Sequence, residues 1–204
     1  MEDTMAISAQ VVKQLREKCG AGMMDCKRAL EETGGDIDEA VKLLRKKGMA
    51  SADKKASRVA NEGLVDCYIH VGGKIGVMVE INCETDFVAR TDEFRAFVHD
   101  VAMHVAASSP RYVQRDDVPA AVVAAEMDIY TDQARATGKP EPVVVKIAEG
   151  KLNKWYESVV LLDQPFVKDP DKTIDQLRRE LVAKTGENVE VRRFARFQLG
   201  EDLA

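Results

Sequence analysis

The sequence predicts an α+β protein, in which a three-helix bundle precedes an antiparallel-sheet core domain with helices. Three observations predict this class. The first fifty residues carry three short helical patterns, residues 64–82 then alternate apolar and polar side chains, and a last strand pattern covers residues 188–200. Strand patterns at both ends of the core, with helices between them, favour one sheet that the C-terminal strand closes.

The N-terminal helices have clear start and stop signals. Ser8 can cap the first helix, and the glycine-rich Gly20–Gly22 ends it. A second helix follows directly. Asp36, with Glu39 three residues further on, forms a capping-box pattern for the third helix, which Gly48 is expected to close.

These signals divide the chain into three parts. We expect a three-helix module over residues 1–50 and a core and dimerisation domain over residues 63–204. Residues 51–62 have almost no large apolar side chains, so they are expected to form a linker, as a solvated helix or an extended segment.

A β-hairpin opens the core domain. Val65, Cys67 and Ile69 alternate with polar side chains, and a second alternating run covers residues 74–82. The pair Gly72-Gly73 lies between the two runs and suits a tight turn. The second strand leads directly into the stretch CETDF.

Helices are expected to fill most of the remaining core domain. Thr91 can cap a long helix that ends at Pro110. The last strand alternates Val189, Val191, Ala195, Phe197 and Leu199 with charged side chains. Between them we expect helices over residues 116–140, 144–153 and 173–186 and a strand over residues 155–162.

Composition argues against several classes of protein. The chain has 204 residues, a net charge of -5 and only 5% aromatic residues, which disfavours broad binding to nucleic acid through phosphates or stacked bases. No apolar run is long enough for a membrane span, and no targeting peptide is evident, so we expect a cytoplasmic protein. Translation could start at Met5.

Patterns for catalysis or metal binding are weak. The four cysteines form no CxxC pair and are expected to be free thiols in a reducing compartment. His99 and His104 lie five residues apart on one predicted helix and point to different faces, so no metal site is expected. The stretch GAGMMDCK lacks phosphate-loop spacing. We expect neither a cofactor nor an enzyme, although a Cys/His nucleophile stays open.

Two regions have the character of recognition surfaces. Met23 and Met24 lie at a tight turn of a bundle that is too small to bury both, beside the basic residues Arg16 and Lys27. Core packing of the methionines and a plain solvated basic face are the alternatives.

Phe87 is the second candidate, because it follows a strand and has polar neighbours. Glu84, Thr85, Asp86 and Arg90 would form a polar rim around one ring, as at an interface anchor. A phenylalanine in this position is more often part of the core, and that alternative stays open.

Five blocks resemble the family of bacterial translation elongation factor Ts, in collinear order over essentially the whole chain. The most specific block is TDFV at the end of an apolar strand. The blocks are LREKCGAGMMDCKRAL (15–30), EINCETDFVAR (80–90), MHVAAS (103–108), GKPEPVVVKIAEGKLNKWYESVVLLDQPFVKD (138–169) and RFARFQLGE (193–201).

The resemblance implies guanine nucleotide exchange on elongation factor Tu, with a ubiquitin-associated-like N-terminal module gripping that GTPase. It implies a tip that inserts near the partner's magnesium and phosphate site, formed by Thr85, Asp86, Phe87 and Val88, with the Asp-Phe pair intruding. The other partner-binding residues that it implies are Arg16, Met23, Met24, Lys27, Ile75, Gly76 and His104.

The chain departs from the family pattern in two respects. Cys19 stands where the family usually has threonine. The chain also lacks the second sheet unit and the helical hairpin that longer members insert between the TDFV and MHxAAS blocks. Short members form homodimers in which the GTPase touches both subunits, so we expect a homodimer. One hairpin here matches parts of two in longer members, which makes Ile75 and Gly76 the least direct assignments.

Two other functions stay open from the sequence. A binding adaptor without exchange activity would use the N-terminal bundle but would leave the TDFV tip without a role. An enzyme using Cys/His chemistry would be inactivated by thiol alkylation.

Overall fold

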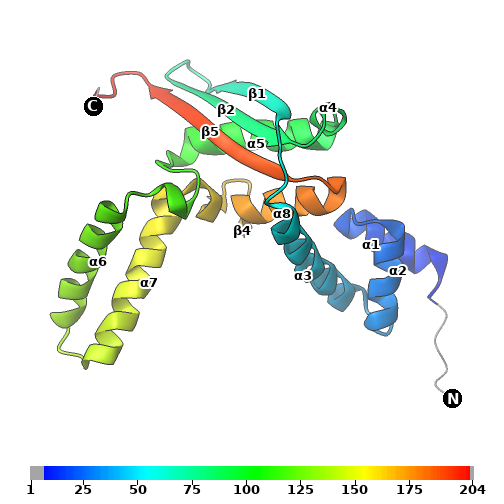
Figure 1. Cartoon of the computed structure of the whole chain (residues 1–204), viewed down its shortest axis with the longest axis horizontal. Coiled ribbons are helices and arrows are strands. Elements are labelled where there is room, and N and C mark those ends of the chain that lie inside the picture. Colours follow the sequence, from blue (N-terminus) through cyan, green and yellow to red (C-terminus); the bar gives the residue numbers. More distant parts are fainter. Residues whose placement is uncertain (1–6, 203–204) are drawn as a thin grey trace. The chain divides into compact units, whose positions relative to one another are not determined.

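The computed structural model describes residues 7–202 and confirms the expected class, with N-terminal helices followed by an antiparallel sheet and further helices (Figure 1). The chain packs into two compact units. Among the described residues, the first unit comprises 7–63, 82–94 and 176–190, and the second comprises 64–81, 95–175 and 191–202. The alternative start at Met5 lies outside the described residues, and the three-part domain division stays a prediction.

Three helices form the N-terminal module: α1 (Ala9–Cys19), α2 (Met23–Glu32) and α3 (Ile37–Lys55). Both predicted caps are present. The Ser8 hydroxyl accepts a hydrogen bond near the start of α1, and the Asp36 carboxylate accepts two at the start of α3. The small shared core consists of Val12, Leu15, Cys26, Ala29, Leu30 and Ala40.

The predicted end of α3 at Gly48 is wrong, because the helix continues to Lys55. Gly48 is instead a contact position between two helices. A Cβ atom at this position would lie 3.2 Å from the Cβ atom of Ala183 on α8 (Ile174–Thr185), so the glycine allows two helices to approach closely. The first residues of the expected linker are therefore helical.

The main sheet has three strands in the order β1 (Glu62–Ile69), β2 (Ile75–Cys83) and β5 (Val189–Gln198). The β1–β2 hairpin and the closing C-terminal strand are confirmed. Helix α5 (Asp92–Ser108) runs along one face of the sheet (Figure 1), where Tyr68 on β1 meets His99 edge-on at 5.8 Å between ring centroids.

The alternation along β5 changes phase, which the sequence did not predict. Val189 and Val191 are buried, as one face of a covered strand should be. Arg192 and Arg193 are both exposed, and beyond them Phe197 is exposed as well. The apolar residues at the end of β5 therefore face solvent and do not continue the core.

Two long helices, α6 (Ala120–Arg135) and α7 (Glu141–Val159), pack side by side in an antiparallel pair (Figure 1). The predicted strand over residues 155–162 is wrong, since α7 includes its first half. Buried Val144, Ala148 and Leu152 recur every four residues, and this helical stripe decides the local structure over the strand preference of the residues near Trp155.

The remaining elements are short apart from α8, the predicted helix near the C-terminus, which is confirmed. A two-stranded antiparallel ribbon was not predicted. These short elements are the 3₁₀ helices Arg115–Asp117 and Leu161–Asp163, the strands β3 (Pro165–Phe166) and β4 (Asp169–Thr173), and the single-turn helix α4 (Asp86–Ala89).

Candidate partner-binding site

The tip, residues 85–88, lies directly after β2 and begins helix α4. Thr85 is the N-cap, and its hydroxyl oxygen accepts a hydrogen bond from the Val88 N–H at 3.4 Å. This turn leaves the Phe87 side chain 78% exposed, whereas Phe94 on the following helix is fully buried. The tip therefore presents a large apolar ring to solvent.

Charged groups surround the base of this ring. The Asp86 carboxylate pairs with the Arg90 guanidinium at 2.7 Å, one helical turn away. Behind the tip, the Cys83 thiol donates to the Thr85 carbonyl oxygen at 3.1 Å, and burial raises the pKa of this thiol to about 11. Cys83 is thus a protonated, structural thiol and is poorly suited to nucleophilic chemistry.

Glu187, in the connection between α8 and β5, is the residue of this site that the sequence analysis missed. Its carboxylate accepts hydrogen bonds from the backbone and the side chain of Thr85. The contact joins residues that are 102 positions apart, so no local pattern could reveal it. The only available signal was a carboxylate in a turn beside a predicted strand.

The N-terminal module presents the second set of predicted residues. Met23 is 48% exposed and Met24 is 64% exposed, at the start of α2. Arg16 on α1 and Lys27 on α2 are also exposed, and the Lys27 ammonium pairs loosely with Glu31 at 3.8 Å. The bundle core does not enclose the two methionines, so they are available as flexible apolar contact surface.

The structure places Ile75 and Gly76 at the start of β2 in the second unit. The Ile75 carbonyl oxygen accepts from the His70 N–H at 2.9 Å, closing the hairpin. A Cβ atom on Gly76 would lie 3.1 Å from Cδ1 of Ile69, so Gly76 makes room for the neighbouring strand. Both residues are half-buried.

His104 on α5 is fully buried, in contrast to the other predicted contact residues. The Val167 N–H donates to Nδ1 at 3.3 Å, so the ring proton is on Nε2, which lies 2.9 Å from Oε1 of Gln164. Burial lowers the pKa of His104 and favours the neutral ring. As placed, His104 supports the surrounding fold, and a contact with a partner stays a prediction.

The described residues offer neither a metal-binding cluster nor a membrane span. Within residues 7–202, no group of three or more His, Cys, Asp or Glu side chains is arranged to hold a metal ion. Over the same range, no helix combines the length and the apolar character that a membrane span requires.

The family model described as elongation factor TS matches residues 2–201. The chain belongs to the elongation factor Ts family. Curated proteins named elongation factor Ts are similar over nearly their full length. The protein of Geobacter sulfurreducens is 59% identical over 98% of this chain and 92% of its own length. That of Carboxydothermus hydrogenoformans is 58% identical over 97% and 91%, and that of Thermoanaerobacter pseudethanolicus is 56% identical over 97% of each chain.

Membership in the elongation factor Ts family implies nucleotide exchange on elongation factor Tu during translation elongation. Nucleotide exchange makes and breaks no covalent bond. A site that consists of exposed apolar side chains and surface charges, with its nearest thiol buried, is consistent with this activity.

Proposed function

We propose that this chain is a cytoplasmic guanine nucleotide exchange factor, not an enzyme, that binds elongation factor Tu and promotes GDP release. The tip disturbs the magnesium and phosphate site of the GTPase, while the N-terminal module holds the same partner. We further propose that the factor works as a homodimer and binds neither nucleic acid nor membranes.

The exposure of Phe87 carries this proposal. A phenylalanine that is 78% exposed on a single-turn helix gains the free energy of burial when it inserts into another molecule. The Asp86 carboxylate beside it would compete for the positive charge that neutralises the nucleotide phosphates. Ring and carboxylate therefore approach the partner together, from one turn of helix.

The N-terminal module supplies binding energy away from the tip. Met23 and Met24 can adapt to an apolar groove, and Arg16 and Lys27 can pair with acidic groups around it. Ile75, Gly76 and His104 complete the proposed set of partner-binding residues, with His104 acting from beneath the surface in the conformation described.

Exchange activity requires differential binding. The factor must bind the nucleotide-free GTPase more tightly than the GDP-bound form, and the coupling between the two ligands is reciprocal. Burial of a phenylalanine ring contributes about 2–3 kcal/mol, and each tenfold loss of nucleotide affinity needs about 1.4 kcal/mol. Phe87 can therefore account for about two orders of magnitude, and the remaining contacts must supply the rest.

Stopped-flow release of fluorescent GDP from elongation factor Tu tests the function. The wild-type protein should accelerate release, and Phe87→Ala should slow the accelerated rate by about a hundredfold without unfolding the protein. Val59→Ala is the matched control, because Val59 is also highly exposed in the first unit but lies outside the tip. Unchanged release with wild-type protein would refute exchange activity, and an unchanged rate with Phe87→Ala would remove Phe87 from the mechanism.

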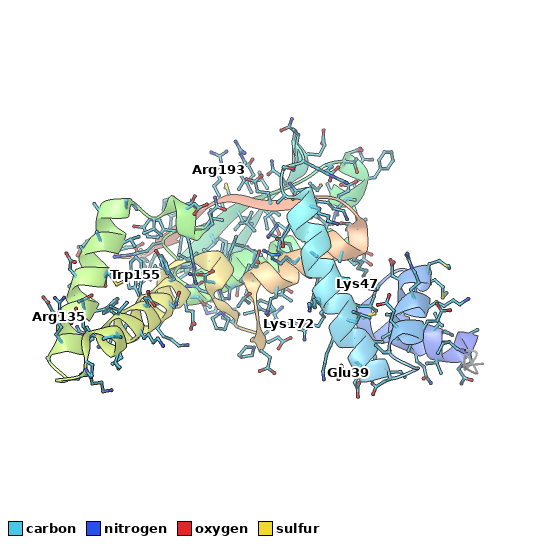
Figure 2. All side chains as sticks on the ribbon, turned by 60° about the horizontal axis from the view of Figure 1, so that its bottom comes forward. Glu39, Lys47, Arg135, Trp155, Lys172 and Arg193 are labelled. Atoms are coloured by element: carbon cyan, nitrogen blue, oxygen red, sulfur yellow. The ribbon has the colours of Figure 1, made fainter. Side chains whose placement is uncertain are left out.

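The homodimer is supported by the uncovered face of the main sheet, which we call the outer sheet face. Its large apolar side chains are exposed although they lie on regular strands: Val65, Ile69, Met78 and Phe197. Beside them, Glu80 on β2 pairs with Arg193 on β5 at 2.6 Å, and Figure 2 labels Arg193 on its strand. An apolar centre with charges of both signs beside it can match a second copy of itself across a two-fold axis.

Sedimentation equilibrium tests the oligomeric state. The wild-type protein should sediment as a dimer, and Met78→Lys should weaken the dimer by at least about tenfold, because it would bury a charge at the centre of the outer sheet face. Val145→Lys is the control, because Val145 is exposed on α7 and lies outside the outer sheet face. A wild-type monomer at micromolar concentration would refute the dimer.

A further inference from the structure

The connection between α8 and β5 is built to direct one carboxylate. Gly186 adopts a φ of 80°, which favours glycine and lets the chain leave α8 sharply. The next residue, Glu187, is half-buried, and its N–H donates to the Thr185 hydroxyl oxygen at 3.3 Å. The backbone of Glu187 is thereby held at the end of the helix.

Within residues 7–202, the Glu187 carboxylate accepts three hydrogen bonds, all from the segment at which the tip begins. Oε2 accepts from the N–H groups of Glu84 at 3.1 Å and Thr85 at 3.0 Å. Oε1 accepts from the Thr85 hydroxyl at 2.6 Å. Hydrogen bonds to an ionised acceptor are roughly twice as strong as neutral ones, so this is a firm attachment.

A second carboxylate makes the attachment reciprocal. The Glu84 carboxylate accepts from the Asn188 N–H at 2.6 Å, and this hydrogen bond lowers the pKa of Glu84. Asn188 is buried, and its side-chain amide donates to the Arg58 carbonyl oxygen at 2.9 Å. Each of the two adjoining segments thus provides a carboxylate that binds the backbone of the other.

The tip cannot hold its own geometry. A helix of four residues has no stability of its own in water. Its N-cap hydroxyl, on Thr85, accepts from the Val88 N–H and donates to Glu187, so the carboxylate fixes the direction in which the cap points. The exposed Phe87 ring makes too little contact with its own chain to do this.

We propose that Glu187 is the positioning residue of the tip: it holds the N-cap Thr85 so that Phe87 is presented in its inserting geometry before the partner arrives. The inference rests on the proposed exchange function. Ordering a segment in advance lowers the cost of binding and of forming the distorted, nucleotide-free complex. Loss of Glu187 should therefore lower the rate of GDP release at saturating factor more than it lowers the affinity of the factor for elongation factor Tu.

GDP release from elongation factor Tu is the first test. At saturating factor, Glu187→Ala should lower the release rate about tenfold and Glu187→Gln about threefold, because glutamine keeps one acceptor oxygen. Glu190→Gln is the matched control. Glu190 is exposed three residues further on, and its side chain makes no hydrogen bond or ion pair with residues 7–202.

A double-mutant cycle with Phe87→Ala separates positioning from general stabilisation. If Glu187 acts through the ring, Glu187→Gln causes no further loss of rate in the Phe87→Ala protein. Losses that multiply independently would overturn the proposal. An undiminished rate with both Glu187 variants, in a protein whose Phe87→Ala variant is slow, would overturn it as well.

Amide hydrogen exchange of the free protein provides a readout that needs no partner. Glu187→Gln should increase exchange at residues 84–88 by about threefold or more, with the protection of α5 unchanged. Unchanged amide protection of the tip in Glu187→Gln would refute the positioning role, even if the protein accelerates GDP release from elongation factor Tu. If the wild-type protein does not accelerate GDP release from elongation factor Tu, the proposed function fails. The amide hydrogen-exchange result then still decides whether Glu187 orders the tip. If Glu187→Ala does not fold, Glu187→Gln carries both tests.

Discussion

Phe87 and His104 come from the same family resemblance, yet the structure places them at opposite extremes of exposure. The Phe87 ring is 78% exposed on a single-turn helix, whereas His104 is fully buried with both ring nitrogens hydrogen-bonded. The contrast shows that the residues of one family resemblance can include an exposed side chain and a buried one that supports the surrounding fold.

The contrast also concerns energy. The Phe87 ring contributes little to folding of its own chain, because it stays mostly in water. His104 connects α5 to the segment before β4, since Gln164 and the Val167 N–H both bond to its ring. Removal of the imidazole would leave Oε1 of the buried Gln164 and the Val167 N–H without their partner, and an unsatisfied buried polar group costs about 1–3 kcal/mol.

The largest expected effect is therefore on stability. His104→Ala should lower the free energy of unfolding by about 2–4 kcal/mol, through unsatisfied polar groups and a cavity. Phe87→Ala should change it by less than about 0.5 kcal/mol, as for other exposed positions. Urea denaturation followed by circular dichroism measures both values.

The two variants should rank in the reverse order by their loss of GDP-release activity. At temperatures well below the unfolding midpoint of His104→Ala, this variant should keep most of the accelerated release rate that Phe87→Ala loses. If His104→Ala instead retained full stability and no longer accelerated GDP release, His104 would be a direct contact that becomes exposed in the complex. It would then not be a supporting residue.

Local rules predicted most of the fold, and they were wrong where another element decides. Ser8, Asp36 and Thr91 act at helix starts as expected, because a cap depends on neighbours in sequence. Gly48 reads as a helix end, but its role depends on contact with Ala183. The strand expected at residues 155–162 gave way to α7, since its residues pack against α6 and its flanks.

The site was predictable to a similar degree. The polar neighbours of Phe87 and the small size of the bundle around Met23 and Met24 indicated exposed side chains but left core packing open, and the structure places all three at the surface. Burial of His104 depends on Gln164 and Val167, about sixty residues away. Glu187 was missed for the same reason, because its partners lie a hundred residues earlier.

A second effect concerns the base of the tip. Burial raises the pKa of the Cys83 thiol to about 11 from 9.0, so at pH 8 it has about a hundredfold less thiolate than an ordinary cysteine. N-Ethylmaleimide should therefore modify exposed Cys67 at least about a hundredfold faster than Cys83, as followed by peptide mass spectrometry. Equal rates would mean that the base of the tip opens readily, against the ordered tip proposed here.

The smallest effect is the dependence of stability on pH through His104. Burial lowers its pKa in the folded protein below the ordinary value of 6.5, so the unfolded chain takes up a proton first as the pH falls. The contribution of His104 to stability is therefore fully present above pH 6.5 and is lost as the pH falls through the folded pKa. Urea midpoints measured between pH 8 and pH 5 should fall more steeply for the wild-type protein than for His104→Gln, which cannot titrate. Parallel curves would mean that the ring is equally free to protonate in both states, which a ring that accepts the Val167 N–H in a buried site should not be.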